Sequence, residues 1–173
     1  AGVDMPGEGA TWDEWAAALM EVKEATSITA GLAMDRTAHR WAGPAFSYGA
    51  KFFDDAGNPI LVDEGFRNYA EVFVGWHQSG LMPAEGWPAG EGTQYRNAAP
   101  LFQSGEVAMH MSGSWMINSY ATNITDFDWK AVPAPCGVGG CGAMPGGAAI
   151  VAFKSTDVPD AAAAFIDFLA SEE

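Results

Sequence analysis

Residues 101–115 place a short apolar strand between two glycines, and this order constrains the fold more than any other stretch of the chain. The pattern predicts the end of a helix at residues 101–104, a turn at Gly105 and a strand at residues 107–111. Gly113 then provides a hinge shortly before Trp115. A helix that is followed at once by a strand predicts an α/β protein, in which the two kinds of element alternate.

The rest of the chain repeats this alternation. Thr11 and Glu14 have the spacing of a capping box, and Trp12 and Trp15 open an apolar stripe behind them, so a helix is predicted to about Glu24. After this helix, the pattern predicts a strand at 27–34, an irregular segment at 35–49, a turn at 54–59 and a helix from 63 that ends at Gly80. The next predicted elements are a loop at 82–93 and helices at 94–104 and 115–122. The last are a strand at 129–132, a loop at 133–147, a strand at 148–153 and a helix capped by Asp157.

Some of these elements carry expectations about burial. The strand at 148–153 is apolar throughout, so it is expected in the interior of a sheet. The helix at 94–104 is expected to turn Tyr95 inward. The last helix is expected to face inward with Ala161, Ala164, Phe165, Phe168 and Leu169.

The chain is acidic, with 22 Asp and Glu residues against 8 Lys and Arg, a formal charge of −14. Such a surface repels nucleic-acid phosphates and anionic lipids, so neither is an expected partner, and an uncharged ligand fits it better than an anion. With 49% hydrophobic residues, the 173-residue chain can bury one core or two small lobes. No stretch of the sequence is long and apolar enough to span a bilayer.

Cys136 and Cys141 enclose four small residues. A disulfide across this short loop is favoured, and it would indicate an oxidising, exported setting. Reduced thiols are the first alternative. Half of a zinc site is the second, although no further Cys or His pair has ligand spacing.

Catalysis finds little support in the sequence. His39, His77 and His110 are far apart along the chain, and residues 113–115 lack the second glycine of a nucleophile elbow. His110 lies between two methionines, but neighbours in a strand face opposite sides, so no metal site is predicted there. No pair of carboxylates stands out for glycoside hydrolysis. We therefore expect neither an enzyme nor a cofactor.

Four segments of the chain, taken in order, resemble the extracellular solute-binding proteins of carbohydrate ABC transporters, the family built like maltose-binding protein. They are AGVDMPGEGATWDEWAAAL, DDAGNPILVDEGFRNYAEVFVGWHQSGLMP, LFQSGEVAMHMSGSW and VPAPCGVGGCGAMPGGAAIVAFKSTDVPDAAAAFIDFLASEE. None of them is specific alone, but the four in register cover nearly the whole chain.

The resemblance implies part of a type II periplasmic-binding-protein fold. It implies most of the second lobe in residues 1–113 and the returning part of the first lobe in residues 114–173. Family members also have a first-lobe segment before the matched region and closing helices after it, so the resemblance implies a fragment. The cysteine loop is not a general feature of the family.

The resemblance also implies a function. Such a protein captures a sugar or oligosaccharide between two lobes and delivers it to permease subunits in the membrane. A monomer in the periplasm or outside the cell is implied, associated with the membrane through the transporter or through a lipid anchor outside this chain. A carbohydrate-active enzyme, a lectin-like module and a fragment with no ligand of its own are the alternatives.

Several of the seven tryptophans are candidate sugar contacts under this reading. A sugar site needs flat aromatic faces for C–H surfaces and a few fixed polar groups for hydroxyls. Trp115 lies where the resemblance implies the mouth of the cleft, and Trp41 and Trp87 lie in irregular context. Packing at a lobe interface or in the core is the alternative for each. The tryptophans on helical stripes are expected in the core, namely Trp12, Trp15 and Trp76.

Polar and small residues adjoin the candidate rings. Arg40 precedes Trp41 and offers a planar fork to paired hydroxyls. Gly113 and Ser114 let the backbone pass close to a ligand, and Gly146 and Gly147 leave room near the strand that follows them. For the glycines a turn requirement is the alternative, and for Arg40 a surface position or a carboxylate partner.

Overall fold

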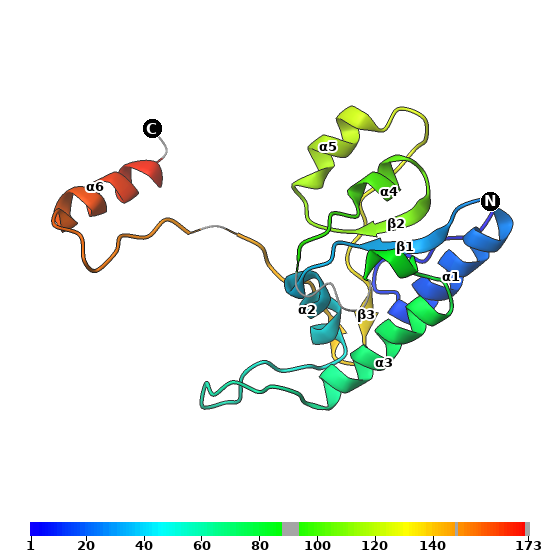
Figure 1. The fold of residues 1–173 in the computed structure, drawn as a ribbon, viewed down its shortest axis with the longest axis horizontal. Helices are drawn as coiled ribbons and strands as arrows, with labels where there is room; N and C mark the ends of the chain where they lie inside the picture. Colours follow the sequence, from blue (N-terminus) through cyan, green and yellow to red (C-terminus); the bar gives the residue numbers. More distant parts are fainter. Residues whose placement is uncertain (88–93, 148, 172–173) are drawn as a thin grey trace.

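Two parallel strands and the helices around them form the body of the protein (Figure 1). The computed structural model describes residues 1–87, 94–147 and 149–171. The elements are, in order, α1 (Trp12–Ala25), β1 (Ala30–Met34), α2 (Ala38–Ser47), α3 (Glu64–Gln78), the 3-10 helix η1 (Ala84–Gly86), α4 (Ala99–Gln103), β2 (Val107–Met111), α5 (Met116–Asn123), β3 (Cys136–Gly137), β4 (Gly140–Cys141) and α6 (Pro159–Leu169). This order confirms the predicted α/β class. No helix in these ranges has the length and apolarity that crossing a membrane requires.

Strands β1 and β2 pair in parallel, in a register that runs from Ala30 opposite Val107 to Met34 opposite Met111. Parallel strands need a crossover connection, and here the crossover holds α2, α3, η1 and α4. All five residues of β1 are buried. Because the strands run the same way, their carboxyl ends lie at the same edge of the sheet.

Helix α1 begins as predicted. The Thr11 hydroxyl accepts a hydrogen bond from the Glu14 backbone N–H at 3.2 Å, and the Glu14 carboxylate accepts from the Thr11 N–H at 2.7 Å. Trp12 and Trp15 lie on its buried face. The Trp12 indole N–H donates to Ser47 Oγ at 3.1 Å, which joins α1 to the end of α2.

Helix α3 supplies the aromatic centre of the core. Asp63 caps it by accepting a hydrogen bond from the Phe66 N–H at 2.8 Å. Tyr69 is fully buried, and its ring centroid lies 4.8 Å from that of Trp41 and 5.9 Å from that of Trp76. Trp76 and the two tryptophans of α1 are buried, which confirms their predicted place in the core.

Helix α2 corrects the prediction of an irregular segment at residues 35–49. Thr37 caps the helix by accepting from the Arg40 N–H at 3.4 Å, and Pro44 lies inside it. The sequence pattern does not indicate this helix because Gly43 and Pro44 have poor helix propensity and because small residues fill much of its buried face. Packing against the rings of α3 therefore stabilises a helix that local propensity does not predict.

The helix predicted at residues 94–104 is shorter in the structure. Helix α4 starts only at Ala99, and Pro100 lies in its first turn. Proline is favoured at a helix start and disfavoured in the interior, so it sets this boundary. The residues before α4 pair instead with the chain that follows β1. Tyr95, which was expected to face inward, is exposed.

Residues 129–132 do not form the predicted strand. Trp129 packs edge-on against Tyr120 of α5, with ring centroids 5.6 Å apart. A strand needs a hydrogen-bonded neighbour, and within the described ranges no strand pairs with this segment.

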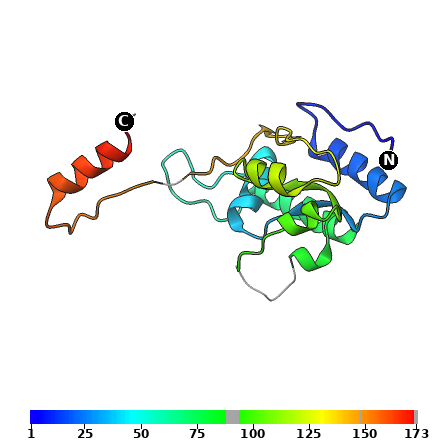
Figure 2. The same cartoon turned by 90° about the horizontal axis from the view of Figure 1, so that it is seen from above.

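Residues 149–171 form an arm that extends away from the body and ends in α6 (Figures 1 and 2). Residues 149–153 are exposed and form no strand, so the predicted buried strand is wrong there, while residue 148 lies outside the described residues. Val158, rather than Asp157, is the cap residue of α6. The residues of α6 that were predicted to face inward are exposed, namely Ala161, Ala164, Phe165, Phe168 and Leu169. An apolar pattern predicts which residues share one face of a helix, but not which part of the protein covers that face. Neither view shows a described element beside α6.

The division of the chain at residue 113 stays a prediction. Helix α5, which follows that residue, packs on α4 through a cluster of Ala99, Tyr120 and Ile124. The ring of Tyr120 lies 5.1 Å from that of Phe102. Contacts with the body therefore continue beyond residue 113.

A disulfide closes the short hairpin of β3 and β4. Cys136 and Cys141 are bonded to each other and lie opposite one another in the ladder. The Cys136 N–H donates to the Ala10 carbonyl at 2.9 Å, and the Gly139 N–H donates to the Ser47 carbonyl at 2.6 Å. The hairpin thus ties the start of α1 to the end of α2. Since both thiols are in the disulfide, the zinc-site alternative is wrong.

Candidate functional site

Polar residues follow directly where β1 and β2 end. Asp35 comes after Met34, the last residue of β1, and Ser112 comes after Met111, the last residue of β2. Because the two strands are parallel and in register, these side chains meet at one edge of the sheet. In α/β proteins, ligands bind in the crevice outside the carboxyl ends of the strands. This edge is therefore the candidate site.

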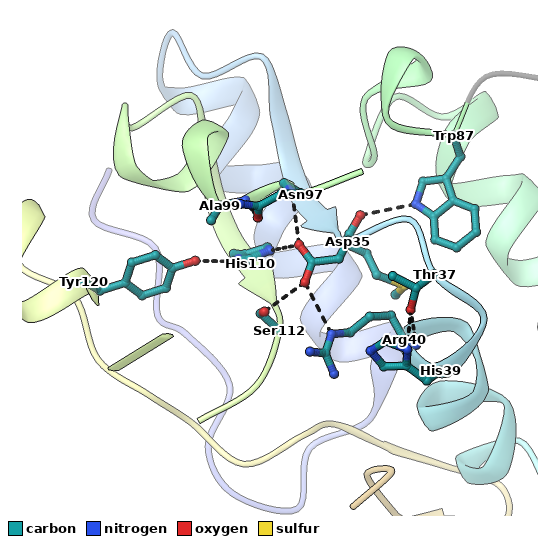
Figure 3. Close-up of polar contacts among 12 residues, drawn as sticks. Asp35, Thr37, His39, Arg40, Trp87, Asn97, Ala99, His110, Ser112 and Tyr120 are labelled. Carbon is teal, nitrogen blue, oxygen red and sulfur yellow. Dashed lines mark hydrogen bonds and ion pairs between the residues drawn. The ribbon is translucent and has the colours of Figure 1, made fainter. Parts of the chain in front are cut away.

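The Asp35 carboxylate lies at the centre of the site (Figure 3). Its Oδ1 accepts hydrogen bonds from the Ala98 backbone N–H and from His110 Nε2, each at 3.0 Å. Its Oδ2 accepts from the Ser112 hydroxyl at 2.9 Å and from Arg40 Nε–H at 3.4 Å. The carboxylate is buried. One side chain thus holds together the end of β1, helix α2, the start of α4 and strand β2.

Burial and hydrogen bonding act in opposite directions on Asp35. Burial raises the pKa of this carboxyl group, but hydrogen bonds from His110, Ala98 and Ser112, with the charge of His110, outweigh it and lower the pKa to about 2. Asp35 is therefore ionised at neutral pH. It presents a fixed negative charge to Arg40.

Acid is expected to weaken the fold through Asp35. Folding lowers the pKa of this carboxyl from 3.8 to about 2. Its ionised form should then contribute about 2 kcal/mol to the free energy of unfolding, fully present above about pH 5 and lost between about pH 4 and pH 2. Unfolding of the wild type and of Asp35→Asn from pH 6 to pH 2 measures this contribution. The wild type should lose more stability over that range, and parallel curves would contradict the expectation.

Behind Asp35, His110 connects β2 to α5. Its side chain is 1% exposed, and its Nδ1 is hydrogen-bonded to the Tyr120 hydroxyl (Figure 3). Burial, with the charge of Asp35, raises the pKa of Tyr120 to about 12. Because both imidazole nitrogens are engaged and the ring is buried, His110 supports the strand ends and is not placed to act as a general base.

Arg40 and Trp115, both singled out from the sequence, meet on the outer side of this cluster. The Arg40 side chain is 8% exposed and lies on α2. Its guanidinium carbon lies 4.5 Å from the centroid of the Trp115 ring, within the range of a cation–π contact. Trp115 is 58% exposed. A large aromatic ring and a cation therefore stand together where the site opens to solvent.

Small residues adjoin the Trp115 ring. A Cβ at residue Gly113 would lie 2.2 Å from two atoms of the ring, so only glycine lets the indole fold back over that position. A Cβ at Gly146 would lie 3.4 Å from the same ring, whereas one at Gly147 would meet nothing within 4 Å. Ser114 lies between the glycine and the indole in sequence and lines the adjacent cavity.

The other two candidate rings pack inward. Trp41 lies 4.5 Å from Phe66, and Trp87 lies 5.0 Å from Phe73, measured between ring centroids. The Trp87 indole N–H also donates to the last carbonyl of β1 at 3.3 Å (Figure 3). Both rings are partly buried. The geometry therefore favours Trp115 as the ring that a ligand contacts.

A cavity of about 470 Å³ opens beside the end of β2. Residues 112–114 form part of its wall, and residues 129–135 form another part. Most of the remaining wall consists of apolar side chains from α1, β2 and α5. A mostly apolar wall with a few polar groups is typical of sites for small ligands.

Sequence reasoning missed the centre of the site. Asp35 and Ser112 were not candidates, and His110 was considered only as a base or a metal ligand. One signal could have found them: Asp35 and Ser112 each follow directly on an apolar strand, at its carboxyl end. Among the described residues, no three His, Cys, Asp or Glu side chains form a group that could hold a metal ion.

The family model of bacterial extracellular solute-binding proteins matches residues 1–173. The chain belongs to this family. The membership agrees with the resemblance of the four sequence segments, and the family's description places such proteins outside the cytoplasm. Because the family is defined by solute binding, the residues of functional interest in this chain are those that could contact a solute.

Solved structures share the fold of this solute-binding protein at low sequence identity. An ABC substrate-binding protein from Listeria monocytogenes, in complex with cycloalternan, is 18% identical with a TM-score of 0.72, and the match covers 99% of this chain and 42% of that one. The GacH receptor of Streptomyces glaucescens, solved unliganded and with acarbose, is 21% identical with a TM-score of 0.68, covering 98% and 43%. Maltose-bound MalE3 of T. maritima is 19% identical with a TM-score of 0.63, covering 98% and 44%.

These neighbours establish the fold of the solute-binding protein. They confirm the predicted architecture, part of a type II periplasmic-binding-protein fold. The chain spans 42% to 44% of the length of the three neighbours. A search of curated protein sequences gives no match.

Proposed function

We propose that this protein is the substrate-binding component of an ABC transporter, which captures a sugar or oligosaccharide and delivers it to permease subunits in the membrane. The family supports a solute-binding role. The three neighbours, solved with cycloalternan, with acarbose and with maltose, support a sugar as the solute. The observation that carries the proposal is the exposed Trp115 ring beside the Arg40 guanidinium at the carboxyl ends of two parallel strands.

The chemistry of this pair suits a sugar. The C–H face of a pyranose packs on an aromatic ring, and its hydroxyls accept hydrogen bonds from a planar guanidinium. In this proposal Trp115 and Arg40 make these contacts, and Ser114 adds a hydroxyl. Gly113 and Gly146 let the ring lie close against the backbone. Trp41, Trp87 and Gly147 stay proposed as secondary contacts.

The mechanism follows from contacts on two sides of one ligand. Residues 1–113 and 114–173 belong to different lobes in this proposal, and a ligand that touches both selects the closed arrangement. The permease then recognises the closed form. The protein is proposed to act as a monomer in the periplasm or outside the cell, held near the membrane by the transporter or a lipid anchor. Binding alone is proposed, with no chemical conversion of the sugar.

A thermal-shift screen of the purified protein tests this function. Maltose, maltotriose and acarbose are the first ligands, with glucuronate as an anionic comparison, since the charge of −14 disfavours anions. We expect a saturable rise in melting temperature for at least one neutral sugar, since ligand at 100 times its Kd adds about 2.7 kcal/mol of stability. A flat response to every sugar would contradict the proposal. Release of reducing sugar over time would favour the carbohydrate-active enzyme instead.

A further inference from the structure

We infer that Asp35 is a positioning residue for Trp115, and that it acts through Arg40. The inference rests on the proposed function in one respect, since it takes the Trp115 ring as the surface that a sugar contacts. Three side chains form a line from the interior to solvent. The Asp35 carboxylate is buried, the Arg40 guanidinium lies between, and the Trp115 indole is exposed.

The first link in this line is the pair of Asp35 and Arg40. Arg40 Nε–H donates to Asp35 Oδ2 at 3.4 Å, and the two side chains are 8% and 3% exposed. A guanidinium is planar, so a bond at Nε sets the direction in which its two terminal nitrogens point. Figure 3 shows these nitrogens on the side away from the carboxylate. Asp35 therefore fixes where the cation lies and leaves its terminal donors free of the carboxylate.

The second link is the contact of Arg40 with Trp115. The guanidinium carbon lies 4.5 Å from the ring centroid, and the positions of Gly113 and Gly146 adjoin the same ring. Among the described residues, the Trp115 ring has the Arg40 guanidinium as its cation–π partner, and its indole N–H has no hydrogen-bond partner that would orient it. An exposed ring without such a partner takes its orientation from the groups it packs on. The glycines offer the ring no side chain to pack on, so the cation held by Asp35 selects the orientation of the indole.

Asp35 itself is held on its other side. The Ala98 N–H, His110 Nε2 and the Ser112 hydroxyl all donate to it. These bonds and the ion pair with Arg40 all stabilise the fold, but only the pair with Arg40 can also orient Trp115. The orienting effect of Asp35 can therefore be separated from its effect on stability, because only the orienting effect is lost completely when Arg40 is replaced.

The variants Asp35→Asn and Arg40→Gln, alone and combined, test the link in the full protein. The readout is the indole N–H resonance of Trp115 in a ¹H–¹⁵N NMR spectrum, identified by its loss in Trp115→Phe. We expect each single variant to move this resonance to a similar position, and the double variant to move it no further. Asp54→Asn is the control, because Asp54 also accepts several hydrogen bonds but lies in an exposed turn. It should leave the resonance in place.

Ligand affinity and stability separate positioning from a purely structural role. With maltotriose as the probe, loss of the cation–π support should weaken Kd by about two- to tenfold in Asp35→Asn, and by at least as much in Arg40→Gln, which also loses the proposed donor to the sugar hydroxyls. Adding Asp35→Asn to Arg40→Gln should weaken Kd no further, although it should still lower the urea midpoint through the bonds to Ala98, His110 and Ser112.

Two results would overturn the inference. One is an Asp35→Asn protein whose Trp115 resonance stays at the wild-type position while that of Arg40→Gln moves. The other is a further loss of affinity when Asp35→Asn is added to Arg40→Gln. If Asp35→Asn does not fold, Asp35→Glu keeps the charge but displaces the carboxylate, and an unmoved resonance there has the same meaning. If the wild type binds no sugar, the proposed function fails while the resonance still decides the inference.

Discussion

Replacing Asp35 with alanine is expected to lower the free energy of unfolding by about 3 to 5 kcal/mol, the cost of breaking a buried ion pair. The change leaves the Arg40 guanidinium buried without its counter-charge. It also removes the acceptor for the Ala98 N–H and the Ser112 hydroxyl. Because these groups come from separate elements, the loss should appear as a lower midpoint of one cooperative transition in urea.

Asp54 provides a matched control for this variant. It also accepts hydrogen bonds from backbone N–H groups, at Ala56 and Asn58, but it lies in an exposed turn. Asp54→Ala should therefore cost about 1 kcal/mol or less. Similar losses for the two variants would show that Asp35 does not hold the strand ends together.

Replacing Trp12 with alanine should also lower the free energy of unfolding by about 3 to 5 kcal/mol, as expected for removal of a buried aromatic side chain. Trp12 is 2% exposed, its ring lies 5.3 Å from that of Trp76, and its N–H donates to Ser47. The variant opens a cavity between α1 and α3 and removes the hydrogen bond that joins α1 to α2. Urea unfolding measures the loss.

Two further variants serve as comparisons for Trp12→Ala, one at the same residue and one at an exposed tryptophan. Trp12→Phe keeps an aromatic ring and loses the hydrogen bond to Ser47, so its cost should be clearly smaller than that of Trp12→Ala. Trp115→Ala removes a tryptophan that is largely exposed, and its cost should stay within about 0.5 kcal/mol. A Trp12→Ala variant no less stable than Trp115→Ala would contradict the burial of this ring.

Local signals in the sequence predict the elements that form this core. The capping box at Thr11, the cap at Asp63 and the glycines around β2 each act within a few residues, and each element lies where they indicate. Helix α2 is not predicted, because tertiary packing stabilises it against the low propensity of Gly43 and Pro44. Helix α4 begins later than predicted, because Pro100 sets its start. The arm is a different case, since its helix is predicted correctly but the burial of its apolar face is not.

The candidate site likewise contains residues that the sequence suggests and residues that it does not. The resemblance to a family identifies Trp115, and the residue type suggests Arg40, because an exposed aromatic and a planar cation are recognisable in sequence. The residue type of Asp35 does not mark it in this way, and its one local signal is its place directly after an apolar strand. Its partners His110 and Ser112 lie 75 and 77 residues away in the chain and reach it only because β1 and β2 pair in parallel. A contact of this kind depends on the fold and cannot be predicted from residue spacing.

Calorimetric titration of maltotriose into wild type and Trp115→Ala tests the proposed sugar-binding role most directly. Phe53→Ala is the control, because Phe53 is also an exposed aromatic but lies in the turn between α2 and α3. We expect saturable binding to the wild type and to Phe53→Ala. Loss of the stacking surface should weaken binding to Trp115→Ala by more than about 1 kcal/mol, or about fivefold in Kd. Equal affinity for Trp115→Ala and wild type, or no heat of binding for any of the three proteins, would contradict the proposed site.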